Sequence, residues 1–107
     1  MKRYGMAIGL KPEAEEEYRQ CHAAVWPDVL DMIRKCHIRN YSIYLKNGIL
    51  FSYFEYHGTD FEADMAQMAA DPATKRWWAL VGPMQQPLAS RREGEWWAAM
   101  EEVFHTD

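Results

Sequence analysis

The first stretch of the chain alternates between large and small or polar residues. The large ones stand at every second position, at Tyr4, Met6, Ile8 and Leu10. A period of two residues predicts a β-strand with one bulky face and one small face. The small face, built largely of glycine and alanine, can admit a close neighbour.

The spacing then changes to that of a helix. Pro12 suits a first helical turn, and the glutamates that follow favour the positive end of the helix dipole. Apolar or aromatic residues continue at intervals of three and four, at Tyr18, His22, Val25, Val29 and Met32 or Ile33. The pattern predicts a long helix packed on a sheet, which Pro27 is expected to kink or restart.

Strand patterns return between Ile38 and Tyr56. Asn47-Gly48 lies between two runs of β-branched and aromatic residues, and this dipeptide predicts a two-residue type I′ turn. Both strands carry apolar side chains at odd and even positions. In the first strand, we expect one face to carry Tyr41, Ile43 and Leu45 and the other to carry Ile38 and Tyr44.

Two further helices are expected in the second half of the chain. Thr59 and Glu62 have the spacing of a capping box, which starts a helix that ends before Pro72. Asp71 is expected to cap the next helix, which continues to Leu80.

The C-terminal part predicts a loop over residues 82–94 and a last strand through Met100, Val103 and Phe104. The order strand, helix, strand, strand, helix, strand predicts an α+β, ferredoxin-like βαββαβ sandwich with helices on one face of an antiparallel sheet. Because the other face also carries apolar side chains, we predict a homodimer, most simply a two-fold one.

Composition narrows the class of protein. The 107 residues are enough for one domain, which we expect to span residues 1–107. A net charge of −4 with both signs interspersed argues against nucleic acid or a membrane surface as a partner. Two cysteines in helical patterns predict no disulfide framework, and no segment reaches the roughly 20 apolar residues of a membrane span. We therefore expect a cytoplasmic protein with a small-molecule partner or a second copy of itself.

Candidate chemistry is concentrated in aromatic positions. Tyr18, His22 and Trp26 recur every four residues, so a phenol, an imidazole and an indole share one helix face. Rings with one titratable group suggest a sugar pocket. Spacing alone nevertheless favours a structural role for His22, and it describes Tyr18 and Tyr41 first as core aromatics whose hydroxyls find a partner.

The tryptophans form adjacent pairs. Trp77 and Trp78 point about 100° apart on a helix, so one is expected in the core and the other toward a ligand. We expect Trp96 and Trp97 to serve the dimer or a neighbouring loop, and Trp26 to anchor its helix.

The sequence predicts no metal centre. Cys21-His22 and Cys36-His37 are sequence neighbours, and adjacent helical residues do not converge on one ion. A phosphate-binding glycine-rich loop and a Gly-x-Ser-x-Gly elbow are both missing from the sequence.

Four segments taken together resemble the L-rhamnose mutarotase family: residues 17–27, residues 40–45, Arg76-Trp77-Trp78 and residues 102–105. The resemblance implies an isomerase that interconverts the α and β anomers of L-rhamnose without a cofactor, on a ferredoxin-like chain that dimerises into an α/β barrel. It also implies that His22 is the catalytic acid. The sugar-binding residues that it implies are Tyr18, Tyr41, Trp77 and Trp78.

The residues suit that chemistry. Mutarotation delivers a proton to the ring oxygen and removes one from the anomeric hydroxyl, which gives an open aldehyde that recloses on either face. Histidine, with a pKa of about 6.5 when unperturbed, can hold or release a proton at neutral pH. Phenols can hydrogen-bond sugar hydroxyls, and indoles can cover an apolar sugar face. The sequence leaves the second proton-transfer group unassigned.

Other functions stay open at this point. Asp28 and residues 85–92 differ from the pattern of rhamnose-specific members, so L-fucose is an alternative sugar. A non-catalytic ligand-binding or dimerisation module and a small ferredoxin-like monooxygenase could each use the same scaffold.

Overall fold

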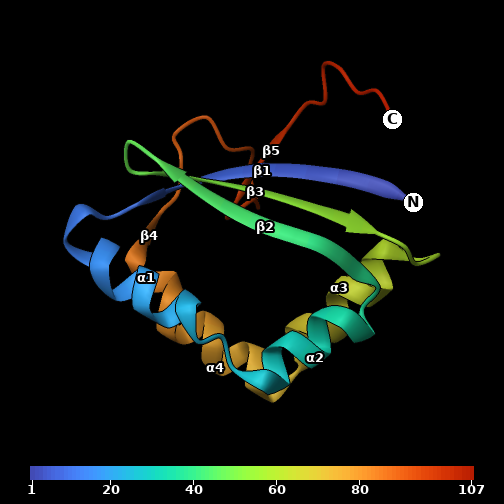
Figure 1. The fold of residues 1–107 in the computed structure, drawn as a ribbon, viewed down its shortest axis with the longest axis horizontal. Coiled ribbons are helices and arrows are strands. Elements are labelled where there is room, and N and C mark those ends of the chain that lie inside the picture. The colour runs from blue at the N-terminus through green and yellow to red at the C-terminus, as the bar shows by residue number, and fades with distance from the viewer.

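The computed structural model describes all residues from Met1 to Asp107 as an antiparallel sheet curled over one layer of helices (Figure 1). The elements are β1 (Lys2–Leu10), α1 (Glu15–Ala23), α2 (Pro27–Lys35), β2 (Ile38–Lys46), β3 (Ile49–Tyr56), α3 (Phe61–Ala70), α4 (Pro72–Val81), β4 (Gln85–Gln86) and β5 (Ala98–Met100). Short 3-10 turns precede α1 at Pro12–Ala14 and follow α4 at Gly82–Met84.

The sheet confirms the predicted α+β, ferredoxin-like architecture. Its order is β2-β3-β1, and β4 and β5 both pair with the remaining edge of β1. All four helices lie on one face (Figure 1). The predicted hairpin turn is also confirmed, because Asn47 and Gly48 have φ of 50° and 72°, as a type I′ turn requires.

The predicted long helix is restarted at Pro27, as one of the two expected outcomes. Trp26 is extended, with φ −60° and ψ 135°, because the residue before a proline avoids the helical region. Pro27 then occupies the first position of α2, where its missing N–H leaves no hydrogen bond unmade. The helices α1 and α2 consequently meet at an angle (Figure 1).

The predicted cap of α3 is wrong by one residue. Asp60 caps the helix, and its carboxylate accepts a hydrogen bond from the Ala63 amide at 3.1 Å. A carboxylate ranks above threonine as an N-cap, which explains why Thr59 is passed over. The prediction for α4 is confirmed, because Asp71 accepts hydrogen bonds from the Thr74 amide and hydroxyl, each at 2.9 Å.

The last strand is shorter than predicted. β5 ends at Met100, and Val103 and Phe104 lie outside any strand with exposed fractions of 89% and 78%. Beyond the end of β5, the Arg3 side chain donates a hydrogen bond to the Glu102 carboxylate at 3.2 Å. The predicted loop is also partly ordered, since it contains the turn Gly82–Met84 and β4.

A β-bulge in β2 corrects the predicted faces of that strand. Between the Arg39–Glu55 and Ser42–Tyr53 pairs, two residues of β2 stand opposite Phe54 alone. One of them, Asn40, has φ of 50°, a left-handed conformation that asparagine tolerates.

The extra residue reverses the alternation beyond the bulge. Ile38 is buried at 3% exposure and packs beside Phe54 on the helix side, rather than sharing a face with Tyr44. Tyr41 is brought to the same side, edge-on to Phe54 with ring centroids 5.5 Å apart. Tyr44 points to the helix-free face and is 65% exposed.

The buried core lies between the sheet and the helices in two clusters. The larger joins β1 and β3 to α1, α2 and α4, and contains Ile8, Leu10, Tyr18, Val29, Leu50, Ala73, Trp77, Val81 and Met84. The smaller joins Ile38, Phe54 and Tyr56 to side chains of α3. None of the helices has the length and apolar character needed to cross a membrane.

Candidate functional site

Tyr18 and His22 lie one turn apart in α1, so their rings stack. The centroids are 4.0 Å apart and the planes 23° from parallel. Tyr18 is buried at 4% exposure, whereas His22 is half-buried. His22 Nδ1 lies 2.9 Å from the Tyr18 carbonyl oxygen. Because a carbonyl can only accept, Nδ1 carries a proton and Nε2 of the neutral ring keeps its lone pair.

The helix α4 places Trp77 against this pair. Trp77 meets the His22 ring edge-on at 5.2 Å and the Trp26 ring edge-on at 5.1 Å. Trp77 is 6% exposed, whereas the neighbouring Trp78 is 46% exposed. Trp77 therefore takes the core position expected for one of the pair, and Trp78 is the indole open to solvent. The sugar contact expected of the other indole stays a prediction.

Tyr41 approaches from the sheet, where the bulge turns it toward the helices. The residue is 42% exposed overall, but burial of the phenol and, to a lesser extent, the nearby Tyr18 phenol raise the pKa of Tyr41 to about 12. A phenol with so high a pKa stays protonated at neutral pH and can donate a hydrogen bond.

Gln85 and Trp96 are connected to the site through the Tyr18 hydroxyl. Nothing in the sequence pattern indicates this connection. Gln85 Nε2 donates to the Tyr18 hydroxyl at 3.3 Å, and Trp96 Nε1 donates to Gln85 Oε1 at 2.7 Å. Gln85 falls within the segment predicted to be a loop. Trp96 is expected from the sequence to serve the dimer or a neighbouring loop. Its link to Tyr18 could not be predicted, because it depends on the pairing of both β4 and β5 with β1.

The surroundings set the protonation of the site. Burial lowers the pKa of His22, and its hydrogen bond to the Tyr18 carbonyl opposes this effect in part. Burial raises the pKa of Tyr18, and the hydrogen bond from Gln85 opposes that effect. The arrangement thus contains one base, His22 Nε2, beside phenols that keep their protons.

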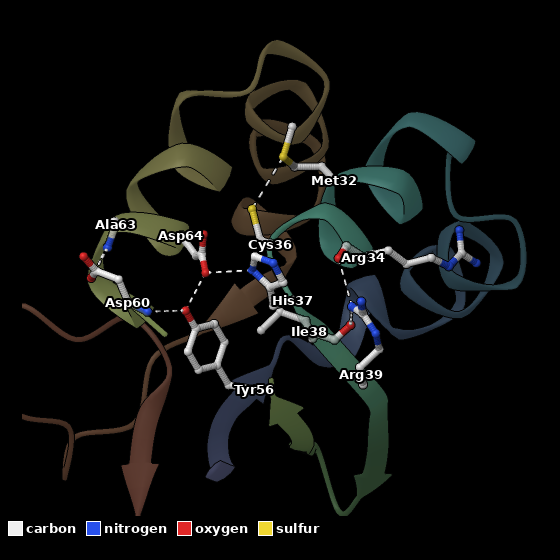
Figure 2. Close-up of polar contacts among 10 residues, drawn as sticks. All are labelled: Met32, Arg34, Cys36, His37, Ile38, Arg39, Tyr56, Asp60, Ala63 and Asp64. Carbon is white, nitrogen blue, oxygen red and sulfur yellow. Dashed lines mark hydrogen bonds and ion pairs between the residues drawn. The ribbon is translucent and has the colours of Figure 1, made fainter. Parts of the chain in front are cut away.

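A second histidine cluster lies at the other end of the helix layer, and sequence reasoning did not find it. Figure 2 shows His37 and Tyr56 both pointing to Asp64. His37 Nδ1 is 3.0 Å from Asp64 Oδ2, and the Tyr56 hydroxyl donates to the same oxygen. The Asp60 amide donates to Tyr56 at 3.0 Å. These bonds hold the start of α3 on the end of the sheet, which is a structural task.

The site offers no obvious place for an ion. No group of three or more histidine, cysteine, aspartate or glutamate side chains gathers in a way that could hold a metal. An imidazole and a phenol side by side are groups that can transfer protons and make hydrogen bonds.

Comparison with known proteins gives a consistent match. The family model described as L-rhamnose mutarotase matches residues 3–106. A protein of Phocaeicola vulgatus named L-rhamnose mutarotase is 32% identical, with all of both chains covered. Proteins of the same name from Sinorhizobium fredii and Lactiplantibacillus plantarum are each 31% identical, with 98% and 100% of both chains covered, respectively.

Two solved structures share the fold. The crystal structure of an L-rhamnose mutarotase from Formosa agariphila has a TM-score of 0.78 at 18% identity, over all of both chains. Tetracenomycin F2 cyclase from Streptomyces glaucescens, a type-II polyketide cyclase, has a TM-score of 0.71 at 16% identity, again over all of both chains. Because such different enzymes share the scaffold, these likenesses establish the fold alone.

Proposed function

The chain belongs to the L-rhamnose mutarotase family, and on this premise we propose that residues 1–107, as a single domain, interconvert the α and β anomers of L-rhamnose. The protein is an isomerase. In the reaction the anomeric hydroxyl loses a proton, the bond between C1 and the ring oxygen breaks, and the ring oxygen gains a proton. Rotation of the aldehyde and the reverse steps give the other anomer.

The stacked Tyr18–His22 pair with a free Nε2 is the observation that carries the proposal. At neutral pH, His22 accepts the anomeric proton through Nε2, because Nδ1 is already committed to the Tyr18 carbonyl. The resulting imidazolium is the catalytic acid and returns a proton to an oxygen of the sugar. A positioned group of this kind contributes roughly 10²- to 10⁴-fold, enough for a reaction that also proceeds in water.

Aromatic residues around His22 bind the sugar in this proposal. Tyr18 and Tyr41 supply hydroxyls that donate to sugar oxygens. Trp78, as the exposed indole, covers the apolar C–H face and methyl group, and Trp77 holds the imidazole in place from the core side.

The test is saturation-transfer NMR of sugar anomers, with L-rhamnose and L-fucose measured in parallel. We expect the folded protein to accelerate exchange of L-rhamnose above the rate in buffer, and heat-denatured protein to leave it unchanged. Faster exchange of L-fucose alone would make that sugar the substrate. No acceleration of either sugar would contradict the proposed function.

We also propose that a second copy of the chain covers the helix-free face of the sheet. Tyr44 and Phe51 are 65% and 37% exposed there, and β1 places the small residue Ala7 opposite Phe51. An exposed apolar surface of this kind in so small a protein favours a two-fold interface.

Light scattering coupled to size-exclusion chromatography tests the dimer. Phe51→Glu is expected to give monomers, because it buries a charge in the interface. Leu80→Glu is the matched control, since Leu80 is equally exposed at 37% but lies on α4, away from this face. A monomeric wild-type protein would contradict the proposal.

We place the protein in the cytoplasm, because both of its cysteines are free thiols.

A further inference from the structure

Trp96, Gln85 and Tyr18 form a chain of hydrogen bonds that ends at the phenol beside His22. Trp96 Nε1 lies 2.7 Å from Gln85 Oε1, and Gln85 Nε2 lies 3.3 Å from the Tyr18 hydroxyl. Gln85 and Tyr18 are 6% and 4% exposed. Water therefore has little access to the bond between Gln85 and Tyr18, and the fold decides its direction.

The indole fixes that direction. An indole nitrogen can only donate, so the amide oxygen of Gln85 must face Trp96 and its NH₂ group must face Tyr18. The NH₂ group can only donate as well, so the Tyr18 oxygen accepts. The Tyr18 hydroxyl makes no other hydrogen bond in the structure, which leaves its own proton free to be donated.

We propose that Trp96 and Gln85 are positioning residues that keep Tyr18 a hydrogen-bond donor to the sugar, an inference that rests on the proposed mutarotase function. With Gln85 reversed, its amide oxygen would face Tyr18 and accept a hydrogen bond from the phenol O–H. The sugar would then meet an oxygen that only accepts. The orientation of one buried amide thus selects whether the phenol beside His22 offers a proton or withholds it.

The strand pairing holds this device in place. Gln85 opens β4 opposite Leu10 of β1, and Ala98 opens β5 opposite Ala7 of the same strand. The bond between Trp96 and Gln85 therefore closes the base of the loop between two short strands on one edge. Although Trp96 is 48% exposed, the Arg91 guanidinium lies 6.0 Å from its ring centroid and steadies it from outside.

A double-mutant cycle in the full-length protein tests the inference. Trp96→Phe keeps an aromatic ring and removes the N–H that sets the amide. We expect L-rhamnose exchange to slow roughly 3- to 10-fold, the scale of one hydrogen bond. In a Tyr18→Phe background, the same substitution should change the rate by less than about 2-fold, because it acts through the phenol. Equal loss in both backgrounds would overturn the inference.

A spectroscopic readout separates this inference from the proposed function. In protein labelled with ¹³Cζ-tyrosine, the Tyr18 signal should shift in Trp96→Phe and in Gln85→Leu. Trp97→Phe is the matched control, since Trp97 packs against the core and its nitrogen makes no hydrogen bond; its Tyr18 signal should match that of the wild type.

The two measurements fail separately. A wild-type protein that does not accelerate exchange contradicts the mutarotase function, whereas the Tyr18 signal still reports the amide orientation. An unshifted Tyr18 signal in Trp96→Phe contradicts the positioning role, whatever the activity.

Discussion

At the scale of residues, one contact with the main chain sets the tautomer of His22. The Tyr18 carbonyl holds the proton on Nδ1, and the stacked phenol removes water from one side of the ring. The four-residue spacing predicts the stacking, because such residues share a helix face. The tautomer of His22 could not be predicted from the sequence, because it depends on how the imidazole ring is oriented about its side-chain bonds.

The pH dependence of exchange follows from the burial of His22. Its pKa lies below the ordinary 6.5 because desolvation disfavours the imidazolium. The neutral ring begins the reaction, so the rate should fall as the pH is lowered through a midpoint below 6.5. Exchange measured between about pH 4.5 and pH 8, with the buffer rate subtracted, checks this sign. An acidic limb centred above the ordinary value would show that the histidine is stabilised as a cation instead.

The tryptophan pair gives a second prediction at this scale. Trp77→Ala opens a cavity in the core and should lower the free energy of unfolding by about 3–5 kcal/mol. Trp78→Ala removes an exposed ring and should leave that free energy within about 1 kcal/mol of the wild type while weakening sugar binding. Urea unfolding followed by circular dichroism, with sugar titration of each folded variant, measures both effects. Unchanged binding in Trp78→Ala would remove that residue from the site.

At the scale of elements, boundaries marked by particular residues could be predicted and insertions could not. Examples are Pro27, Asp71 and Asn47-Gly48. Each acts through its own backbone or side-chain chemistry, so its effect can be predicted from the local sequence. The bulge in β2 is different. Alternation counted along the sequence assumes that every residue pairs, and the unpaired residue near Asn40 reversed the faces that follow.

The bulge can be tested at Asn40. Asn40→Ala and Asn40→Gly both remove the amide that donates to Glu55 at 2.7 Å. Only alanine has a Cβ that disfavours φ of 50°, so it should be less stable than the glycine variant by about 1–2 kcal/mol. Chemical unfolding of the two variants side by side gives this difference. Equal stabilities would mean that the left-handed conformation carries no strain.

The attachment of α3 predicts a sensitivity to acid. Hydrogen bonds from Tyr56 and then from His37 hold the pKa of Asp64 below its usual value (Figure 2). The unfolded chain therefore binds the proton more readily, and this contribution to stability is present above the unfolded pKa and is lost as pH falls through the lower, folded value.

Asp64→Asn should therefore lower the melting temperature at neutral pH and flatten its decline in acid. Asp60 is not a suitable control because it caps the same helix. Glu93→Gln, an exposed change in the loop before β5, is the better one and should melt as the wild type does at each pH. A wild-type slope retained in Asp64→Asn would assign the acid sensitivity to other carboxylates.

At the scale of the whole molecule, the site is an assembly of distant segments. Tyr18 and Gln85 are 67 residues apart in sequence and in contact across the buried core. The order of elements was sufficient to predict the ferredoxin-like layers. Short connections, with helices on one face of the sheet, allow few topologies. It was insufficient to predict which loop residue would meet α1, because β4 has only two residues and little pattern.

Substitution of the two histidines should have different effects, because they lie in different parts of the molecule. His22 lies among the rings of α1 and α4, whereas His37 secures α3 at the opposite end of the helix layer (Figure 1). One is placed to act on a bound molecule and the other to stabilise the fold. Comparison of the two therefore separates catalysis from general effects of losing an imidazole.

The measurement that tests this account most directly is anomer exchange of L-rhamnose by His22→Ala beside His37→Ala, at a temperature where both are folded. We predict that His22→Ala loses roughly 10²-fold or more of the accelerated exchange, while His37→Ala keeps a rate close to that of the wild type. Full activity in His22→Ala, or an equal loss in both variants, would contradict the assignment of His22 as the group that moves the proton.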